Sequence, residues 1–283
     1  MLASQRLRTA GIPPAEADFD ARLLAREVLG WDAATYLTSS GEIPGADFNE
    51  RYEALVSRRE AREPIAYILG RQEFWGRVFE VTPAVLIPRP ETELIVETAL
   101  DLFPERQAAL RMADVGTGSG CLAVTLATEF SQASVIATDT SSAALAVAHQ
   151  NARRFGVADR IAFVEADVVG QPAVHRHFDL IVSNPPYVRD TDRQTLQIEV
   201  IRHEPGTALF GGPDGLAIVR RIVRDAARLL KPSGLLLVEF GLGQADQMEG
   251  LISATPGLTM VALKRDLQGI PRTAVARGGD TPA

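Results

Sequence analysis

A glycine-rich segment between an apolar run and a helical pattern limits the folds open to this chain. Residues 112–115 predict a buried strand, residues 116–120 read Gly-Thr-Gly-Ser-Gly, and residues 121–127 predict a helix. Glycine lets the backbone approach a ligand closely, and the first turn of a helix offers free N–H groups. Helix and strand patterns alternate from about residue 91 onward, which predicts a parallel sheet covered by helices.

Two acids end the next two predicted strands. Residues 133–139 end in Asp139, about 20 residues past the loop, where a carboxylate that accepts both ribose hydroxyls is expected. Residues 163–167 end in Asp167, which can accept a hydrogen bond from an adenine amino group. The glycine spacing differs from a dinucleotide fingerprint, whose last glycine would stand where Cys121 is. Since no Walker lysine is present, these residues predict an adenosine ligand without a phosphate chain, and S-adenosylmethionine fits this description.

Asn184-Pro185-Pro186-Tyr187 follows residues 178–183, which predict another buried strand. Proline has no N–H and keeps the preceding residue extended, so the strand ends at Asn184. Ligands of open α/β sheets bind at the carboxyl ends of strands. The side-chain oxygen of Asn184 and the carbonyl of Pro185 are two acceptors that suit a planar –NH2 group, and Tyr187 offers a flat face for stacking. A plain strand-to-loop turn is the alternative explanation.

In this order the segments resemble the class I S-adenosylmethionine-dependent methyltransferases. Within that class, residues 70–76 (Gly-Arg-Gln-Glu-Phe-Trp-Gly), 86–94 (Leu-Ile-Pro-Arg-Pro-Glu-Thr-Glu-Leu) and 204–215, which end in Gly-Gly-Pro-Asp-Gly, resemble the release-factor glutamine methyltransferases, the PrmC/HemK family. The resemblance extends over about residues 1–277. The Pro-Arg-Pro-Glu-Thr-Glu part of the second segment, residues 88–93, distinguishes this family from relatives that methylate a ribosomal-protein glutamine.

The resemblance implies an α/β fold with a Rossmann-like class I methyltransferase domain, whose mostly parallel seven-stranded sheet has helices on both faces. A small all-α N-terminal domain and a β-hairpin linker are expected before it. The residues agree, because the first 70 residues show helical spacing without a strand pattern, and residues 73–81 alternate around a glycine. We expect a helical substrate-docking domain at 1–70, a hairpin linker at 71–90, the methyltransferase domain at 91–277 and a frayed tail at 278–283.

The implied activity is methyl transfer from S-adenosyl-L-methionine to the side-chain amide nitrogen of the glutamine in the Gly-Gly-Gln motif of class-one peptide chain release factors, which tunes translation termination. The residues alone establish only an –NH2 group on a planar acceptor. Three alternatives stay open: a methyltransferase for a ribosomal-protein glutamine, one for the exocyclic amine of adenine in nucleic acid, and a non-enzymatic S-adenosylmethionine-binding regulator.

The expected site residues follow from the motifs and the resemblance. The catalytic residues are Asn184, Pro185 and Tyr187. The cofactor-binding residues are Gly116, Thr117, Gly118, Ser119, Gly120, Asp139, Asp167, Val168 and Asn184. The substrate-binding residues are Asn184, Pro185, Pro186, Tyr187, Arg89 and Glu91.

Three of the expected residues, and one further candidate, have features that bear on their roles. Val168 stands where many family members carry a bulky aromatic, which affects one adenine contact. Arg89 and Glu91 also suit a helix start, with Glu91 near its positive end. Glu239, at a predicted strand end, is either a residue that shapes the site or a paired structural acid.

Composition narrows the partners. The net charge is −7, and the first 70 residues carry 8 Arg against 11 Asp and Glu, which argues against duplex nucleic acid. One cysteine and four histidines without ligand spacing predict no disulfide and no metal site. No leader and no apolar run of about 18 residues occur. We therefore expect a soluble, cytoplasmic monomer that acts on release factors, without DNA or membrane partners.

Overall fold

The computed structural model describes residues 2–39, 45–168 and 178–279, which fold into two compact units. The helical unit consists of Met1–Arg71 and Gln197–His203, and the methyltransferase unit consists of Gln72–Leu196 and Glu204–Ala283. The chain therefore enters the helical unit a second time after Leu196 and leaves it after His203. Of the expected frayed tail, residues 280–283 lie outside the described residues, and Gly278 ends the last strand.

Six helices form the described part of the helical unit. They are α1 (Ala3–Thr9), α2 (Pro14–Leu29), α3 (Ala33–Thr38), α4 (Phe48–Glu60), α5 (Ile65–Leu69) and α9 (Ile198–His203). Pro14 stands at the first turn of α2, and Gly30 ends this helix in the left-handed conformation. The side chain of Asp32 accepts the N–H of Thr35 at 2.7 Å and caps α3. Local signals in the sequence thus set these helix ends.

A small apolar core holds the unit together. Its buried members are Leu7, Ile12, Ala17, Ala21, Leu24, Val56 and Ile68. The spacing of the α2 members places them on one face of the helix.

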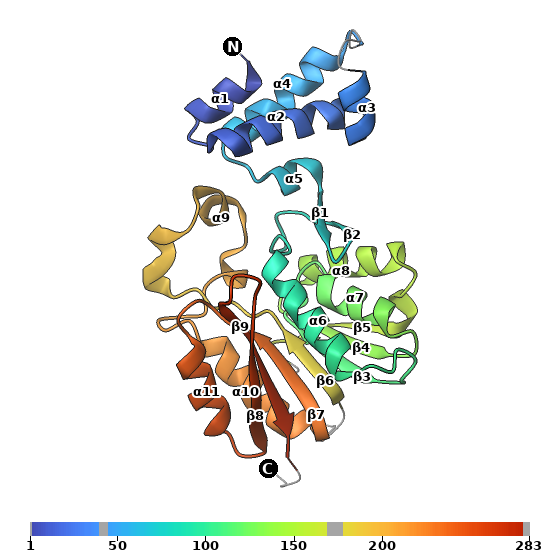
Figure 1. The fold of residues 1–283 in the computed structure, drawn as a ribbon, viewed down its shortest axis with the longest axis vertical. Coiled ribbons are helices and arrows are strands. Elements are labelled where there is room, and N and C mark those ends of the chain that lie inside the picture. The colour runs from blue at the N-terminus through green and yellow to red at the C-terminus, as the bar shows by residue number, and fades with distance from the viewer. Residues whose placement is uncertain (1, 40–44, 169–177, 280–283) are drawn as a thin grey trace. The chain divides into compact units, whose positions relative to one another are not determined.

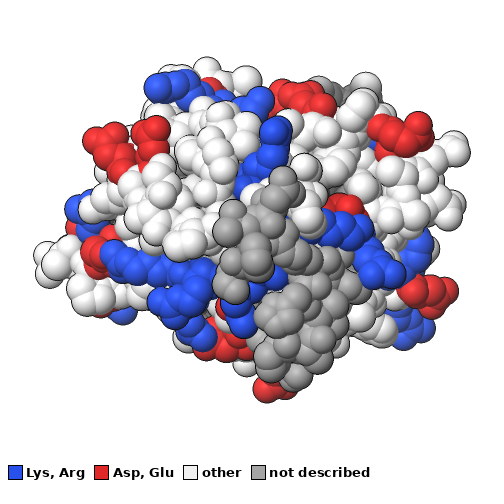
Figure 2. All heavy atoms as spheres, turned by 90° about the horizontal axis from the view of Figure 1, so that it is seen from below, with Lys and Arg blue, Asp and Glu red and all other residues white. Residues whose placement is uncertain are grey.

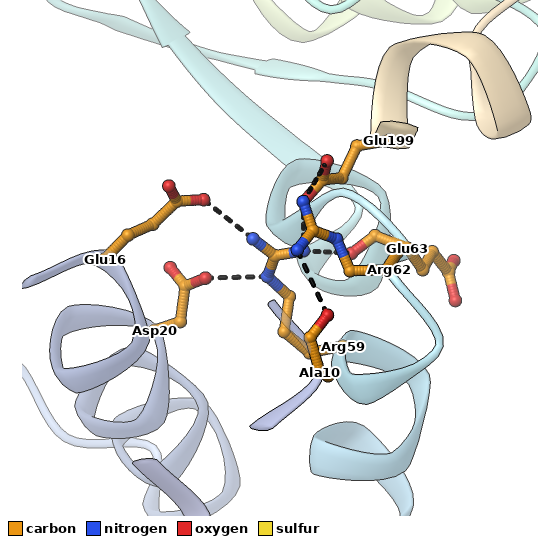
Figure 3. Close-up of polar contacts among 7 residues, drawn as sticks. All are labelled: Ala10, Glu16, Asp20, Arg59, Arg62, Glu63 and Glu199. Carbon is orange, nitrogen blue, oxygen red and sulfur yellow. Dashed lines mark hydrogen bonds and ion pairs between the residues drawn. The ribbon is translucent and has the colours of Figure 1, made fainter. Parts of the chain in front are cut away.

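A buried arginine joins α9 to the rest of the helical unit (Figure 3). Arg59 of α4 is 2% exposed and donates to the carboxylates of Asp20 at 2.6 Å, Glu16 at 2.7 Å and Glu199 at 3.1 Å. Arg62 donates to the Glu199 carboxylate at 2.7 Å. Since α9 has only six residues, these ion pairs and not helix propensity fix its place in the unit.

A hairpin stands at the start of the methyltransferase unit, with Arg71, its first residue, still in the helical unit. Strands β1 (Arg71–Phe74) and β2 (Arg77–Glu80) form a two-stranded antiparallel sheet. Its turn residues, Trp75 and Gly76, have φ angles of 53° and 64°. Positive φ at both positions is typical of a type I′ turn, whose twist matches that of the strands.

The main sheet has seven strands in the order β5-β4-β3-β6-β7-β9-β8 (Figure 1). They are β3 (Arg111–Val115), β4 (Ser134–Asp139), β5 (Ile161–Glu165), β6 (Phe178–Ser183), β7 (Leu230–Glu239), β8 (Leu258–Arg265) and β9 (Pro271–Gly278). Strands β3 to β7 are parallel, whereas β9 is antiparallel to both β7 and β8. The strand order reverses beside β3, where ligand sites of such sheets lie.

Helices cover both faces of this sheet. Helices α6 (Glu93–Leu102), α7 (Cys121–Glu129) and α8 (Ser142–Arg154) share one apolar core with Leu235 and Leu237 of β7. Helices α10 (Ala217–Leu229) and α11 (Ala245–Ser253) share the other core with Leu236 and Val238. Successive strand residues point to opposite faces, so a continuous apolar run marks a strand buried on both sides. The expected fold class is confirmed.

One predicted strand is shifted along the sequence. Strand β5, predicted at residues 163–167, spans Ile161–Glu165, so Asp167 lies in the turn beyond it. Strand β7 begins at Leu230, directly after α10, and Phe178 of β6 pairs with Leu230 next to an irregularity in the register. The described residues also form four short 3-10 segments: η1 (Pro90–Thr92), η2 (Ala158–Arg160), η3 (Asp190–Thr195) and η4 (Gly206–Ala208).

Candidate active site

A cavity of about 360 Å³ lies at the carboxyl ends of the central strands of the methyltransferase unit. Its volume falls in the range of small-molecule sites. The expected site residues that line it are Gly116, Thr117, Gly118, Ser119, Asp139, Asp167, Val168, Asn184, Pro185 and Pro186. The glycine loop, the two acids and the start of the Asn-Pro-Pro-Tyr segment thus meet in one site.

The glycine loop leaves room for a ligand. Gly116 and Gly118 have φ angles of 73° and 54°, and a Cβ added at either one would meet no atom within 4 Å. Both glycines line the cavity, so a side chain there would fill space that a ligand needs. A Cβ at Gly120 would instead lie 3.0 Å from the Cβ of Ala148, so this glycine allows α7 to pack closely on α8.

Asp139 is held by the loop that it faces. Its carboxylate accepts the N–H of Gly118 at 3.0 Å and the N–H of Ser141 at 2.9 Å. A carboxylate has about four acceptor positions, so two remain for ribose hydroxyls. The carboxylate position therefore fits an adenosine ligand.

The second acid is more exposed. Asp167 lines the cavity and pairs with Arg221 of α10 at 2.6 Å. Val168, which follows it, has a φ angle of 58°, which is unusual for a β-branched residue. This conformation turns the chain beside the cavity directly after the acid.

Three glycines allow neighbouring loops to pack on the Asn-Pro-Pro-Tyr segment. A Cβ at Gly211 would collide with the carbonyl oxygen of Pro186, one at Gly215 with the carbonyl oxygen of Tyr187, and one at Gly241 would press on the Tyr187 ring. The Gly-Gly-Pro-Asp-Gly motif is thus explained by close backbone approach.

Gln244 fixes the same loop by hydrogen bonds. This residue is 2% exposed; its Nε2 donates to the Tyr187 carbonyl at 3.1 Å, and its Oε1 accepts the N–H of Gly241 at 2.7 Å. Sequence reasoning missed Gln244, because a lone glutamine carries no spacing signal.

The side chains of the Asn-Pro-Pro-Tyr segment join a buried polar network. Nδ2 of Asn184 donates to Oγ1 of Thr92 at 2.7 Å, and this hydroxyl donates to Oε2 of Glu239 at 2.7 Å. The hydroxyl of Tyr187 donates to Oε1 of Glu239 at 3.1 Å. Among the described residues, none donates a hydrogen bond to Oδ1 of Asn184 or to the carbonyl of Pro185. Both acceptors that the sequence singles out thus have capacity for a ligand.

Burial changes the acidity of this network. Burial raises the pKa of Glu239 to about 7, although the hydrogen bonds from Thr92 and Tyr187 oppose the shift. Burial also raises the pKa of Tyr187, and the neighbouring Glu239 charge adds to this effect. Glu239 therefore pairs with side chains of the expected site, and it also has a perturbed pKa, as functional residues often have.

Four expected residues lie outside the cavity lining: Gly120 and Tyr187, whose contacts are described above, and also Arg89 and Glu91. Arg89 donates to the carboxylate of Glu204 at 2.5 Å, and Glu204 is buried and also accepts the N–H of Ile87 at 3.1 Å. Glu91 belongs to η1 and is half-buried. Their neighbour Thr92 makes the contact with Asn184, a role that sequence reasoning missed although Thr92 stands in the discriminating segment.

In the described part of the chain, no cluster of three or more metal-ligating side chains is found. None of the helices in that part is long and apolar enough to span a membrane.

Comparison with known proteins gives matches along most of the chain. The PrmC N-terminal domain model matches residues 1–70, and the methyltransferase small domain model matches residues 92–213. A release factor glutamine methyltransferase of Bradyrhizobium diazoefficiens is 42% identical over 274 residues, which cover 96% of this chain and 91% of that protein. One of Nitratidesulfovibrio vulgaris is 46% identical over 227 residues, which cover 80% and 76%.

Solved structures agree on the fold. The N-terminal domain of human METTL16, solved with SAH, has a TM-score of 0.52 and 20% identity over 78% of this chain and 83% of that chain. The sheet order and the methyltransferase domain match identify a class I S-adenosylmethionine-dependent methyltransferase. The relatives narrow this class, and the chain belongs to the release factor glutamine methyltransferase family.

Proposed function

We propose that this chain transfers a methyl group from S-adenosyl-L-methionine to the side-chain amide nitrogen of the Gly-Gly-Gln glutamine in class-one peptide chain release factors. The observation that carries the proposal is one cavity lined by the glycine loop, by Asp139, and by Asn184 and Pro185 with their available acceptors. The names of the relatives support a release factor as the substrate.

The acceptors suit the chemistry of an amide. An amide nitrogen is a poor nucleophile because its lone pair is delocalised into the carbonyl, so alignment and electrostatics matter more than a strong base. Oδ1 of Asn184 and the carbonyl of Pro185 accept the two amide protons and fix the amide plane. The nitrogen would gain positive charge as the sulfonium S–CH3 bond breaks and the new C–N bond forms, and the acceptors would bind that state better than the ground state. One amide proton would then be lost to solvent, which leaves the neutral methylamide. Tyr187 stacks on the amide and limits access of water.

Different residues are proposed to hold different parts of the cofactor. When bound, S-adenosylmethionine supplies the methyl group on its sulfonium sulfur. The backbone of the glycine loop, 116–120, would allow close approach, Asp139 would accept the ribose hydroxyls, and Asp167 and Val168 would hold the adenine.

The helical unit is proposed to dock the protein substrate. A glutamine is one residue on a large partner, so the cavity alone cannot select the right protein. The helical unit carries no cofactor motif, and a stabilising cap for the methyltransferase unit is the alternative role.

A nucleic-acid substrate is less consistent with the charges. On the face in Figure 2, Lys and Arg side chains lie among Asp, Glu and uncharged residues. Among the described residues, three of the four arginines of α10 are paired with acids: Arg220 with Asp214, Arg221 with Asp167 and Arg228 with Asp225. Backbone binding of nucleic acid needs an excess of basic residues on one face.

The test is transfer of a tritiated methyl group from labelled cofactor to purified release factor, beside DNA, RNA, ribosomes and isolated ribosomal proteins. Label in the release factor, lost when its Gly-Gly-Gln glutamine is replaced by alanine, is the expected result. Label in DNA, RNA or a ribosomal protein but not in release factor would contradict the proposal. No transfer to any of them, with intact cofactor binding, would favour a regulator.

A further inference from the structure

One hydroxyl connects Asn184 to a buried carboxylate. Thr92, which is 2% exposed, accepts from Nδ2 of Asn184 at 2.7 Å and donates to Oε2 of Glu239 at 2.7 Å. Glu239 is 1% exposed. The three side chains come from the end of β6, from η1 and from the end of β7. Because Thr92 and Glu239 are buried, water does not compete for these hydrogen bonds.

The direction of each hydrogen bond among Asn184, Thr92 and Glu239 can be assigned by counting donors. A threonine hydroxyl has one hydrogen, and an ionised carboxylate only accepts. The Thr92 hydrogen therefore points at Glu239, which leaves the Thr92 oxygen only as an acceptor toward Asn184. The two ends of an asparagine amide have almost the same shape, but only its nitrogen can donate. Thr92 therefore requires Nδ2 on its own side.

We propose that Thr92 and Glu239 are positioning residues, which select the amide orientation of Asn184 that offers Oδ1 to the –NH2 group of the substrate. This inference rests on the proposed function, in which Oδ1 accepts an amide proton. In the opposite orientation the Asn184 –NH2 group would face the substrate –NH2 group, so two donors would meet. Because this orientation is fixed before the substrate binds, the Asn184 amide does not have to rotate during the reaction.

The first test removes the hydroxyl alone. Thr92→Val keeps the side-chain shape but no longer distinguishes the two ends of the amide. We expect kcat on purified release factor to fall on the order of tenfold, which corresponds to one lost hydrogen bond. Thr92→Ser restores the hydroxyl, and most of the lost kcat should return. Calorimetry with S-adenosylhomocysteine should find unchanged affinity in both variants.

Thr98 offers a matched control. It is 1% exposed in α6, and its hydroxyl has no partner among the described residues. Thr98→Val is thus the same buried substitution without the hydrogen-bond chain, and it should leave kcat unchanged. Equal kcat values in Thr92→Val and Thr98→Val would overturn the inference, and so would a loss that Thr92→Ser does not restore.

A second test uses the direction of proton donation. In the native background, Glu239→Gln supplies an N–H that can face Thr92, which frees the Thr92 hydrogen, so kcat should fall. In an Asn184→Asp background the new carboxylate lacks a hydrogen-bond donor, because Thr92 gives its one hydrogen to Glu239. In that background Glu239→Gln should raise kcat, because the introduced amide donates to Thr92 and Thr92 can then donate to the new carboxylate. The same sign of effect in both backgrounds would overturn the inference.

The Asn184→Ala variant separates this inference from the function that it rests on. If Asn184→Ala has native kcat, the assigned role of Asn184 fails, and the positioning role fails with it. If Asn184→Ala is strongly impaired while Thr92→Val is not, only the positioning role is wrong.

Discussion

Glu199 accepts a hydrogen bond at 3.1 Å from the buried guanidinium of Arg59, which lies 140 positions earlier in the chain. Glu199 belongs to α9 of the helical unit, whereas the chain on both sides of Gln197–His203 belongs to the methyltransferase unit. The Asn-Pro-Pro-Tyr segment lies before Gln197–His203 in the sequence, and Glu204 follows directly after it. The helical unit is therefore completed by residues from the middle of the sequence.

Loss of the Glu199 carboxylate should destabilise the helical unit. Burial alone would raise the pKa of Glu199, but hydrogen bonds from Arg62 and Arg59 outweigh it and lower the pKa. Glu199→Ala leaves both guanidinium groups with fewer acceptors in a buried site, which costs on the order of 3 kcal/mol. Chemical unfolding measures this loss. Asp18→Ala, which breaks the exposed pair with Arg8, is the control and should change stability by less than about 1 kcal/mol.

An unfolding free energy for Glu199→Ala as high as that of the control would contradict this account. Such a result would mean that Asp20 and Glu16 satisfy Arg59 without help from α9.

The return of the chain to the helical unit at α9 also shows what could not be predicted from the sequence. Helical spacing in the first 70 residues and strand–helix alternation after residue 91 predicted the architecture, because local periodicity records which faces are buried. No local pattern indicates that Glu199 pairs with Arg59, since that pair depends on tertiary contact alone. Part of the cavity lining carries a local signal, because the glycine loop and the acids Asp139 and Asp167 have characteristic spacing. Thr92 was missed because its role depends on a partner 92 positions away.

Asn184→Ala should reduce turnover by about two to three powers of ten, as expected when one preorganised polar group is removed. Cofactor affinity should change much less, because the glycine loop and Asp139 remain. Steady-state methyl transfer and calorimetry measure the two quantities separately. Turnover close to that of the native chain would refute the two-acceptor mechanism.

Asp139→Ala should weaken the cofactor by a few kcal/mol, since two charge-assisted hydrogen bonds to ribose are lost. The substitution also frees the N–H of Gly118, so the loop itself loses support. Glu165 offers a control, because it is exposed, pairs in register with Asp139 on the next strand and does not line the cavity. Calorimetry should find native affinity in Glu165→Ala; an equal loss in both variants would exclude a specific role for Asp139.

The pH dependence of turnover should report on Glu239, whose pKa burial raises to about 7. Below this pH the protonated carboxyl can donate to Thr92, whose hydrogen is then free to point at Asn184, and the preferred amide orientation is lost. We therefore expect kcat to rise as the pH increases through about 7. Glu239→Gln cannot ionise, and its kcat should not show this rise.

Other ionisable groups near Glu239 do not produce the same profile. The charge of Glu91 raises the pKa of Glu239, and the charge of Arg272 lowers it. The pKa values of Tyr187 and Cys121 are raised well above neutral, so neither group titrates near pH 7. Burial raises the pKa of Asp114 to about 7 as well, but Asp114 supports the glycine loop through Thr117 and Ala123. The ionisation of Asp114 should therefore make cofactor affinity depend on pH, and this dependence should remain in Glu239→Gln. A rise in kcat that also persists in this variant would count against Glu239.

Docking of the release factor should depend on apolar side chains that the helical unit leaves exposed. Phe19 of α2 is 55% exposed and Leu37 of α3 is 77% exposed, although large apolar side chains gain by burial. Phe19→Ala and Leu37→Ala should each raise KM for intact release factor on the order of tenfold with little change in kcat, as expected for contact residues of an interface. A short Gly-Gly-Gln peptide reaches only the cavity, so its KM should stay the same. Leu267→Ala, at a fully exposed turn between β8 and β9, is the matched control. Native KM values for intact factor in both helical-unit variants would favour the role of a stabilising cap, whereas equal losses with factor and peptide would indicate damage to the site itself.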